Sequence, residues 1–338
     1  MSQRENFLHY IADSRIRKRN TIQINLPTYN SYQTTKKLIG LLLNQKNISF
    51  DILLIDDGSG DCRKLLKIYP FLNYILLKKN TGTSGAYRIG MEVALREKYE
   101  YVICTDNDAI LLENDALSRL FKKIKEDRSL GCVAPNHCDN PLTQDVIRKK
   151  QLPYHYLFIR CSVLKKIELH NFYHFLITDD IAFTSKLISK SKILLCHDIL
   201  YHHDPFKPKY LQNQSLYLGV RGFLIILFLE KDISFSLKLY HFFHFFYYPA
   251  ICILHSIKFR DSSYISTMFS AIHNFFLNYK KLGLGSIPKN KYVLVETNQS
   301  LKKASQMNLT NSLWMKKKYY VYSNYYKRKL FFKLTHAD

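Results

Sequence analysis

Four short polar clusters in the first third of the chain contain residue types that can hold phosphate groups and metal ions. They are Pro27-Thr28-Tyr29-Asn30, Asp56-Asp57-Gly58-Ser59, Asn80-Thr81-Gly82 and Asp106-Asn107-Asp108. A single cluster could be an ordinary turn, because Asp, Asn, Gly and Ser favour turns for local reasons. Each cluster, however, follows a short apolar run, and the strand ends of an open parallel sheet face the crevice where ligands bind. The four together therefore predict one binding crevice.

Asp106 and Asp108 are the expected metal ligands in this crevice. They follow the apolar run Tyr101-Val102-Ile103-Cys104, which places them near buried surroundings. A buried carboxylate without a partner costs free energy. A divalent cation that bridges carboxylate and diphosphate oxygens removes this cost, and Mg²⁺ or Mn²⁺ is commonly held in this way. The sequence therefore predicts a divalent metal, Mn²⁺ or Mg²⁺, as cofactor.

The alternation of β-rich runs with helix-length amphipathic stretches predicts an α/β fold, a mostly parallel open sheet flanked by helices. We expect strands at residues 22–26, 51–55, 74–77, 101–105, 131–134 and 154–161. Helices are expected at residues 32–44, 63–69, 84–98, 115–126 and 180–189. The pattern divides the chain into a basic N-terminal segment (1–20), a catalytic domain (21–208) and a mainly helical, aromatic and basic C-terminal region (209–338).

The chain is strongly basic and rich in aromatic residues. It contains 50 Lys and Arg against 27 Asp and Glu, a formal charge of +23, together with 25 Tyr and 22 Phe. This charge favours a polyanionic partner, which could be nucleic acid, an anionic membrane leaflet or the phosphates of a substrate. Charge alone does not choose among the three.

Cysteine usage and the N-terminus indicate a cytoplasmic protein. The seven cysteines are odd in number and lack Cys-x-x-Cys spacing, which favours reduced thiols over disulfides or a zinc site. Residues 1–20 lack the apolar stretch of a secretory signal. The apolar runs at residues 223–229 and 242–254 are shorter than the roughly 20 residues that cross a bilayer.

In order and spacing, the four clusters resemble the motifs of glycosyltransferase family 2, over about residues 21–204. The resemblance implies a GT-A fold that transfers a sugar from a nucleoside diphosphate donor with inversion. It also implies that the first two clusters hold the base and ribose, while Asp106 and Asp108 reach the ribose and the metal, Asp108 being the better metal ligand. The expected donor-binding residues are Pro27, Thr28, Tyr29, Asp56, Asp57, Asn80, Gly82, Arg88, Asp106 and Asn107.

The resemblance extends to the acceptor side. Thr178-Asp179-Asp180 resembles the acidic motif that carries the family's general base, and Asp180 is the expected catalytic residue. Asp179 is a possible substrate contact, but Asp before a helix is also an ordinary N-cap.

A third metal ligand is expected within Tyr201-His202-His203-Asp204, as in rhamnosyl- and galactofuranosyltransferase-like members of the family. Spacing from the acidic pair favours His202, which leaves His203 as a possible substrate contact. Arg221, which follows Tyr217, also resembles a residue of that subgroup. Gly222 stands where asparagine is usual, so the identity of the sugar stays open.

The sequence thus predicts a metal-assisted glycosyltransferase that moves a sugar from a UDP- or dTDP-sugar to a glycan or lipid-linked glycan in cell-surface polysaccharide synthesis. A sugar-nucleotide pyrophosphorylase is the first alternative, and the absence of a Gly-rich loop after the first strand opposes it. A nucleic-acid-binding protein is the second, and the acidic crevice opposes it, so no nucleic acid partner is expected.

A membrane surface is the remaining expected partner. Aromatic residues and lysines alternate at residues 316–333, as in interfacial membrane-binding segments. We therefore expect peripheral attachment to the inner face of the cytoplasmic membrane. The sequence leaves the oligomeric state open.

Overall fold

The computed structural model describes residues 10–139, 141–148, 152–169, 174, 178–203, 211–259 and 263–282. The chain divides into two compact units, one formed by residues 1–207 and 215–287, the other by residues 208–214 and 288–338. The sheet and nearly all residues of the helices described below belong to the first unit. The segment 316–333, for which membrane binding is predicted, lies outside the described residues.

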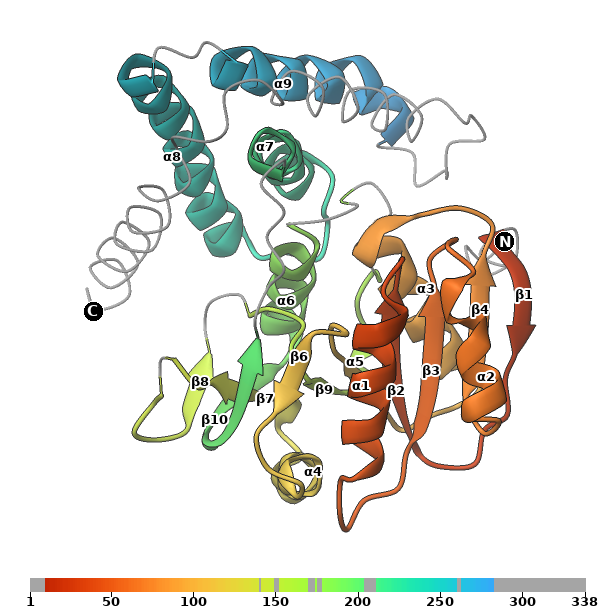
Figure 1. Cartoon of the computed structure of the whole chain (residues 1–338). Helices are drawn as coiled ribbons and strands as arrows, with labels where there is room; N and C mark the ends of the chain where they lie inside the picture. Colours follow the sequence, from red (N-terminus) through yellow and green to blue (C-terminus); the bar gives the residue numbers. More distant parts are fainter. Residues whose placement is uncertain are drawn as a thin grey trace. The chain divides into compact units, whose positions relative to one another are not determined.

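A ten-stranded mixed sheet forms the centre of the first unit (Figure 1). Its strand order is β1-β4-β3-β2-β5-β9-β7-β10-β6, and β8 pairs with β10. The strands are β1 (Ile11–Arg15), β2 (Ile22–Thr28), β3 (Asp51–Asp56), β4 (Asn73–Leu77), β5 (Tyr101–Cys104), β6 (Ala109–Leu111), β7 (Leu130–His137), β8 (Val146–Arg148), β9 (Leu157–Arg160) and β10 (Lys192–His203). The strands β4, β3, β2 and β5 are parallel, whereas β9 runs antiparallel to both β5 and β7. The predicted α/β fold is confirmed.

Helices cover both faces of the sheet. One layer contains α1 (Tyr32–Leu43), α2 (Leu65–Ile68) and α4 (Ala116–Glu126), and the other contains α3 (Gly82–Arg96), α5 (Cys161–Leu164) and α6 (Asp179–Lys190). Alternate residues of β3 face the two layers: Ile52 and Leu54 pack with the first, Leu53 and Ile55 with the second. Every residue of β3 is buried, which explains why this strand reads as a continuous apolar run.

Several strands lie where the sequence pattern predicts none. β1 falls inside the segment 1–20 and pairs antiparallel with β4, so the sheet extends into the segment expected to precede the domain. β10 pairs with β7 in two stretches separated by an irregularity between Cys196 and Leu200. That irregularity carries the polar residues His197 and Asp198, which interrupt the apolar pattern of the strand.

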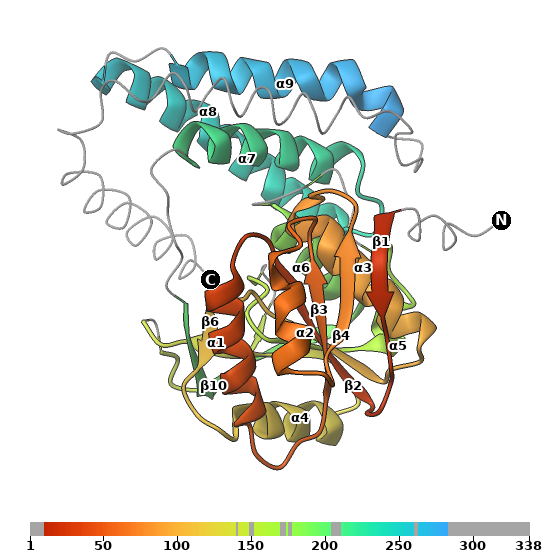
Figure 2. The same ribbon diagram turned by 45° about the vertical axis from the view of Figure 1, so that its right-hand side comes forward.

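Three helices follow the α/β body: α7 (Leu211–Phe228), α8 (Phe235–Phe259) and α9 (Ser263–Leu282). Phe275 of α9 packs against Leu224 and Ile225 of α7, and Phe223 of α7 packs against Ala182 of α6 (Figure 2). Within the described part of the chain, none of the helices combines the length and the apolar character that crossing a membrane requires.

Candidate functional site

The carboxyl ends of β2, β3 and β5 bring the predicted polar clusters to one edge of the sheet. β2 is parallel to both neighbours, and Thr28 at its end pairs with Asp56 at the end of β3. The cluster that begins at Asp106 directly follows β5, on the other side of β2. Pro27 lies inside β2 and is part of the sheet.

Asp56 is completely buried and shapes the loop after β3. Its Oδ1 accepts hydrogen bonds from the amide (2.9 Å) and hydroxyl (2.7 Å) of Ser59 and from the amide of Gly60 (2.9 Å). Its Oδ2 accepts from the amide of Cys62 (3.3 Å) and the hydroxyl of Tyr74 (3.4 Å). Because both oxygens are satisfied inside the protein, Asp56 supports the loop that carries the next aspartate.

Asp57 links the loop after β3 to the loop after β4. Its Oδ1 accepts hydrogen bonds from the amide (2.7 Å) and hydroxyl (2.8 Å) of Thr81. Burial raises the pKa of Asp57 to about 7, although the hydrogen bonds from Thr81 oppose the change. Gly58 permits this approach, since its φ is +88° and a Cβ there would lie 2.6 Å from the backbone carbonyl carbon of Lys79.

Hydrogen bonds also join the ends of β2 and β5 to the start of α1. Nδ2 of Asn107 donates to the hydroxyls of Ser31 (2.5 Å) and Thr35 (3.2 Å). The hydroxyl of Thr28 is hydrogen-bonded to the same two hydroxyls at 2.8 and 2.9 Å. Thr28 and Asn107 thus hold the ends of β2 and β5 and the start of α1 together. Tyr29 is 49% exposed, so its ring is available to stack on a flat ligand.

The third cluster forms the beginning of α3. Oδ1 of Asn80 accepts a hydrogen bond from the amide of Gly82 (2.8 Å), where φ is +73°. Further along α3, Nε of Arg88 lies 2.9 Å from Oε1 of Glu92, and the Arg88 side chain is 16% exposed. Asn80 and Gly82 therefore set the start of the helix, and Arg88 forms an ion pair within it.

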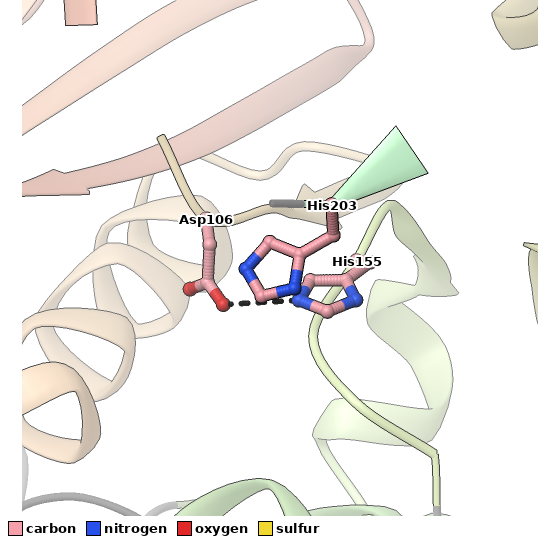
Figure 3. A group of neighbouring side chains, drawn as sticks. All are labelled: Asp106, His155 and His203. Atoms are coloured by element: carbon pink, nitrogen blue, oxygen red, sulfur yellow. Dashed lines mark ion pairs between the residues drawn. The ribbon is translucent and has the colours of Figure 1, made fainter. Parts of the chain in front are cut away.

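Three side chains from distant parts of the sequence gather beyond the end of β5 (Figure 3). They are Asp106 after β5, His155 before β9 and His203 at the end of β10. One ligand atom of each lies within 4.8 Å of the others. Nε2 of His155 is 3.4 Å from Oδ2 of Asp106, and the His155 and His203 ring centres are 4.0 Å apart. Carboxylate and imidazole groups in this arrangement can hold a divalent cation.

Asp108 extends this cluster through His203. Its Oδ1 lies 3.2 Å from Nε2 of His203. Successive residues of a strand point to opposite faces, and Nδ1 of His202 lies instead 3.6 Å from Sγ of Cys138. The geometry therefore favours His203 over the predicted His202 as a metal ligand, and metal binding by Asp106 and Asp108 stays a prediction.

The residues present fit Mn²⁺ better than Mg²⁺. Mg²⁺ is a hard cation that prefers oxygen ligands, whereas two imidazoles beside carboxylates favour a first-row transition metal. Burial would raise the pKa of Asp106, but the hydrogen bonds from His155 and Tyr87 and the electrostatic interaction with His155 and His203 outweigh it and lower that pKa. Asp106 is thus ionised at neutral pH, as a metal ligand has to be.

His155 is the residue of this cluster that sequence reasoning missed. The sequence pattern predicts one strand over residues 154–161, but β9 begins at Leu157 and pairs antiparallel with β5, with Leu157 opposite Cys104. This register brings the residues just before β9 beside those just after β5. The sequence contains no local signal for His155, because its position follows from the pairing of β9 with β5, and that pairing was unknown.

Asp179 and Asp180 lie in the first turn of α6. Asp179 is 3% exposed, and its Oδ2 accepts a hydrogen bond from the hydroxyl of Thr83 at 2.6 Å. Asp180 is half-buried, and its Oδ1 accepts from the amide of Ile181 at 2.7 Å. Asp180 is therefore the more accessible carboxyl group of the two, and Thr83 connects the pair to the start of α3.

The acidic pair holds protons more tightly than ordinary carboxyl groups. Burial raises the pKa of Asp179 to about 7, and the charge of Asp106 adds to the shift. Burial and the neighbouring Asp179 raise the pKa of Asp180 well above its ordinary value. The N-cap position belongs to Thr178 rather than to Asp179. The pair therefore has the raised basicity that a general base near neutral pH requires.

A buried ionic network connects α6 to the segment after α7. Oε2 of Glu230 forms an ion pair with Nζ of Lys186 (2.5 Å), and Oε1 accepts a hydrogen bond from Nε2 of His174 (2.9 Å). All three side chains are at most 1% exposed. Nδ1 of His174 lies 3.0 Å from the hydroxyl of Thr178, next to the acidic pair. Burial opposes the charge, but Lys186 and His174 lower the pKa of Glu230 to about 2. The network therefore holds α6 against the segment that follows α7.

α7 approaches the same turn at Gly222. A Cβ at this position would overlap the side chain of Thr178, so close packing of α7 against this turn requires glycine. Arg221 is buried, with its guanidinium 5.8 Å from the ring centre of Tyr217. Its expected contact with substrate stays a prediction.

The sequence of this chain is similar to that of a known protein family. The sequence profile described as Glycosyl transferase family 2 matches residues 24–184, which run from β2 into α6 and include the metal cluster residue Asp106 and the acidic pair. This part of the chain is similar to glycosyltransferase family 2.

Two curated relatives of this chain act in polysaccharide synthesis by name. Poly-beta-1,6-N-acetyl-D-glucosamine synthase of Staphylococcus aureus (strain COL) is 31% identical over 115 residues, covering 33% of this chain and 27% of that protein. Chondroitin synthase of Pasteurella multocida (strain Pm70) is 29% identical over 128 residues, covering 36% of this chain and 13% of that protein. The matched region thus spans a minor part of either relative.

Solved structures share the fold. Residues 1–349 of S. aureus TarS, in complex with UDP-GlcNAc, align with a TM-score of 0.55 at 14% identity, covering 84% of this chain and 89% of that chain. The mannosyltransferase PcManGT from Pyrobaculum calidifontis, in complex with GDP-Man and Mn²⁺, aligns with a TM-score of 0.51 at 16% identity, covering 92% and 94%. The predicted GT-A arrangement is confirmed.

We expect His203→Ala to weaken Mn²⁺ binding by about tenfold or more, since even the loss of an outer partner of a metal ligand has effects of this size. Asp108→Ala should behave in the same way. Mn²⁺ binding to the purified protein can be measured by electron paramagnetic resonance, with and without UDP. The matched control is His202→Ala, which should bind Mn²⁺ like the wild type. Reversed results for the two histidines would make His202 the ligand.

Glu230→Gln should lower the free energy of unfolding by about 3 kcal/mol, because Lys186 would keep its buried position without a counter-charge. Chemical denaturation followed by circular dichroism measures the change. Glu126→Gln is the control, because the Glu126–Lys122 pair is long and exposed. Equal, small effects of the two substitutions would show that the buried network does not stabilise α6.

Proposed function

We propose that this chain transfers a sugar from a nucleoside diphosphate donor to a hydroxyl group of a glycan or lipid-linked glycan, with inversion at the anomeric carbon. The observation that carries the proposal is the pairing of two carboxyl sites. The ionised Asp106 lies beside two histidines at the end of β5. Burial raises the pKa values of Asp179 and Asp180 on α6, and the negative charge of Asp106 raises them further. One site suits the diphosphate end of a donor, and the other suits an acceptor hydroxyl.

The donor would lie along the edge formed by β2, β3 and β5. The exposed ring of Tyr29 would stack on the nucleotide base, and Asp57 would form a hydrogen bond to the base or the ribose. Asp106, Asp108 and His203, with His155 beside them, would hold a divalent cation. When bound, that cation would offset the negative charge of the diphosphate.

The transfer requires one base and no covalent nucleophile. The acceptor oxygen forms a bond to the anomeric carbon while the bond from that carbon to the diphosphate breaks, and Asp180 takes the proton of the acceptor hydroxyl. Asp179, buried and bonded to Thr83, tunes the basicity of Asp180 and orients the start of α6.

The donor sugar is best approached through a panel. UDP-N-acetylglucosamine comes first, because N-acetylglucosamine appears in the name of one curated relative and UDP-GlcNAc in the TarS complex. UDP-galactofuranose and dTDP-rhamnose follow, because the Tyr217 and Arg221 pattern resembles that subgroup. Release of nucleoside diphosphate from each donor identifies the substrate, and release from none of them would contradict the proposal.

The acceptor is proposed to be at the inner face of the cytoplasmic membrane, where lipid-linked glycans are assembled. The formal charge of +23 supports contact with an anionic leaflet.

Asp180→Asn should leave donor binding near the wild-type value and lower turnover by about a hundredfold or more, the range that a positioned general base contributes. Calorimetry measures donor binding, and nucleoside diphosphate release measures turnover. Asp127→Asn, at the end of α4, is the control and should change neither. A loss of donor binding together with turnover would place Asp180 in the donor site instead.

Turnover should rise with pH as the acidic pair loses its proton, because only the ionised carboxylate accepts a proton from the acceptor. Asp179→Asn should move this rise to lower pH, since it removes the like charge that raises the pKa of Asp180. Turnover measured across the pH range, at saturating donor, tests the shift. A rise that stays in place would separate Asp179 from the titrating group.

A further inference from the structure

The helix α8 carries a continuous exposed apolar stripe. Phe235 (81% exposed), Phe243 (65%), Phe246 (53%) and Leu254 (64%) are its most exposed large residues. Among the α8 residues whose side chains the structure describes, Ser236 is the one exposed residue that is not apolar. We call these exposed residues, from Phe235 to Leu254, the α8 stripe.

The spacing of these residues gives the stripe a defined shape. The exposed positions recur every three or four residues, so at 100° per residue they fall within an arc of about 120°. With a rise of 1.5 Å per residue, the stripe is about 28 Å long. The opposite side of α8 is buried, as Leu237 and His241 show. The helix therefore packs one side against the protein and presents apolar side chains on its exposed side.

The apolar exposure continues onto neighbouring helices. Phe269, Phe276 and Leu277 of α9 are 57–65% exposed, and Phe228 at the end of α7 is 54% exposed. The rings of Phe228 and Phe276 are 6.4 Å apart. A water-soluble surface rarely leaves so many large apolar side chains uncovered unless they meet a partner.

Charge indicates which partner covers the stripe. After Phe235, the acidic residues of the sequence are Asp261, Glu296 and Asp338, whereas lysines and arginines are frequent to the end of the chain. Exposed aromatic residues in a basic part of the sequence suit the boundary between headgroups and acyl chains of an anionic leaflet. A second copy of this chain would bring the same positive charge to the contact.

We propose that the α8 stripe lies in the interface of an anionic membrane, with α8 parallel to the bilayer plane. This inference deepens the membrane contact proposed above, and it locates that contact on a folded helix of the catalytic unit rather than on residues 316–333. The active site is thereby held near a lipid-linked acceptor. None of the described helices needs to cross the bilayer for this arrangement.

The test is binding to vesicles of phosphatidylcholine with and without phosphatidylglycerol, using the full chain. The wild type should co-sediment with the phosphatidylglycerol vesicles, and less strongly as salt rises. The double variant Phe243→Ser/Phe246→Ser should lose about tenfold or more of this affinity, because each exposed phenylalanine contributes buried apolar area in the membrane. Both side chains are more than half exposed, so the variant should fold.

The matched control is Leu112→Ser/Ile147→Ser, which removes two exposed apolar side chains from the α/β body and should bind vesicles like the wild type. Donor hydrolysis without vesicles should be the same in all three proteins. A failure of donor hydrolysis in every protein would count against the proposed function. Vesicle co-sedimentation would still test the membrane contact, because it does not depend on hydrolysis.

Other outcomes would overturn the inference. Equal vesicle binding by the wild type and the α8 variant would place the contact elsewhere in the chain. A wild type that ignores vesicles but sediments as a dimer, and becomes a monomer on Phe243→Ser/Phe246→Ser, would make the stripe an interface between two copies.

Discussion

Repulsion among the carboxyl groups of Asp106, Asp179 and Asp180 is the interaction that the rest of the site has to balance. Asp106 raises the pKa of Asp179, and Asp179 in turn raises the pKa of Asp180. The protein compensates the two ends of the crevice differently. Asp106 is paired with the imidazole of His155, whereas the pair on α6 receives mainly neutral hydrogen bonds. One end is therefore ionised and suited to a cation, and the other holds a proton near neutrality.

This division depends on two long-range contacts of the fold. The antiparallel pairing of β9 with β5 brings His155 to Asp106, and the pairing of β10 with β6 brings His203 to Asp108. On the other side, α6 is held by the buried ion pair between Lys186 and Glu230. The C-terminal helices are therefore part of the catalytic unit in a physical sense, because the start of α6 rests on them.

The distribution of charge explains how one chain can be strongly basic and still hold a cation. Acidic groups gather at the end of the sheet, in positions where neighbouring hydrogen bonds and imidazoles receive them. The excess of lysine and arginine lies elsewhere in the sequence and increases after Phe235. A crevice that favours cations and a surface that favours anions can therefore act together on a donor and a membrane.

The sequence by itself determined the elements and residues whose signals are local. Apolar runs of strand length gave β2 to β5, and the polar clusters after them gave Asp57, Asp106 and Asp108, because strand ends and turn residues are specified by near neighbours. That His203 and not His202 lies beside Asp108, and that His155 lies beside Asp106, was decided by the tertiary structure. Those residues come together through antiparallel pairings of β9 and β10 with distant strands, and the pattern of a strand does not state which strand it will pair with.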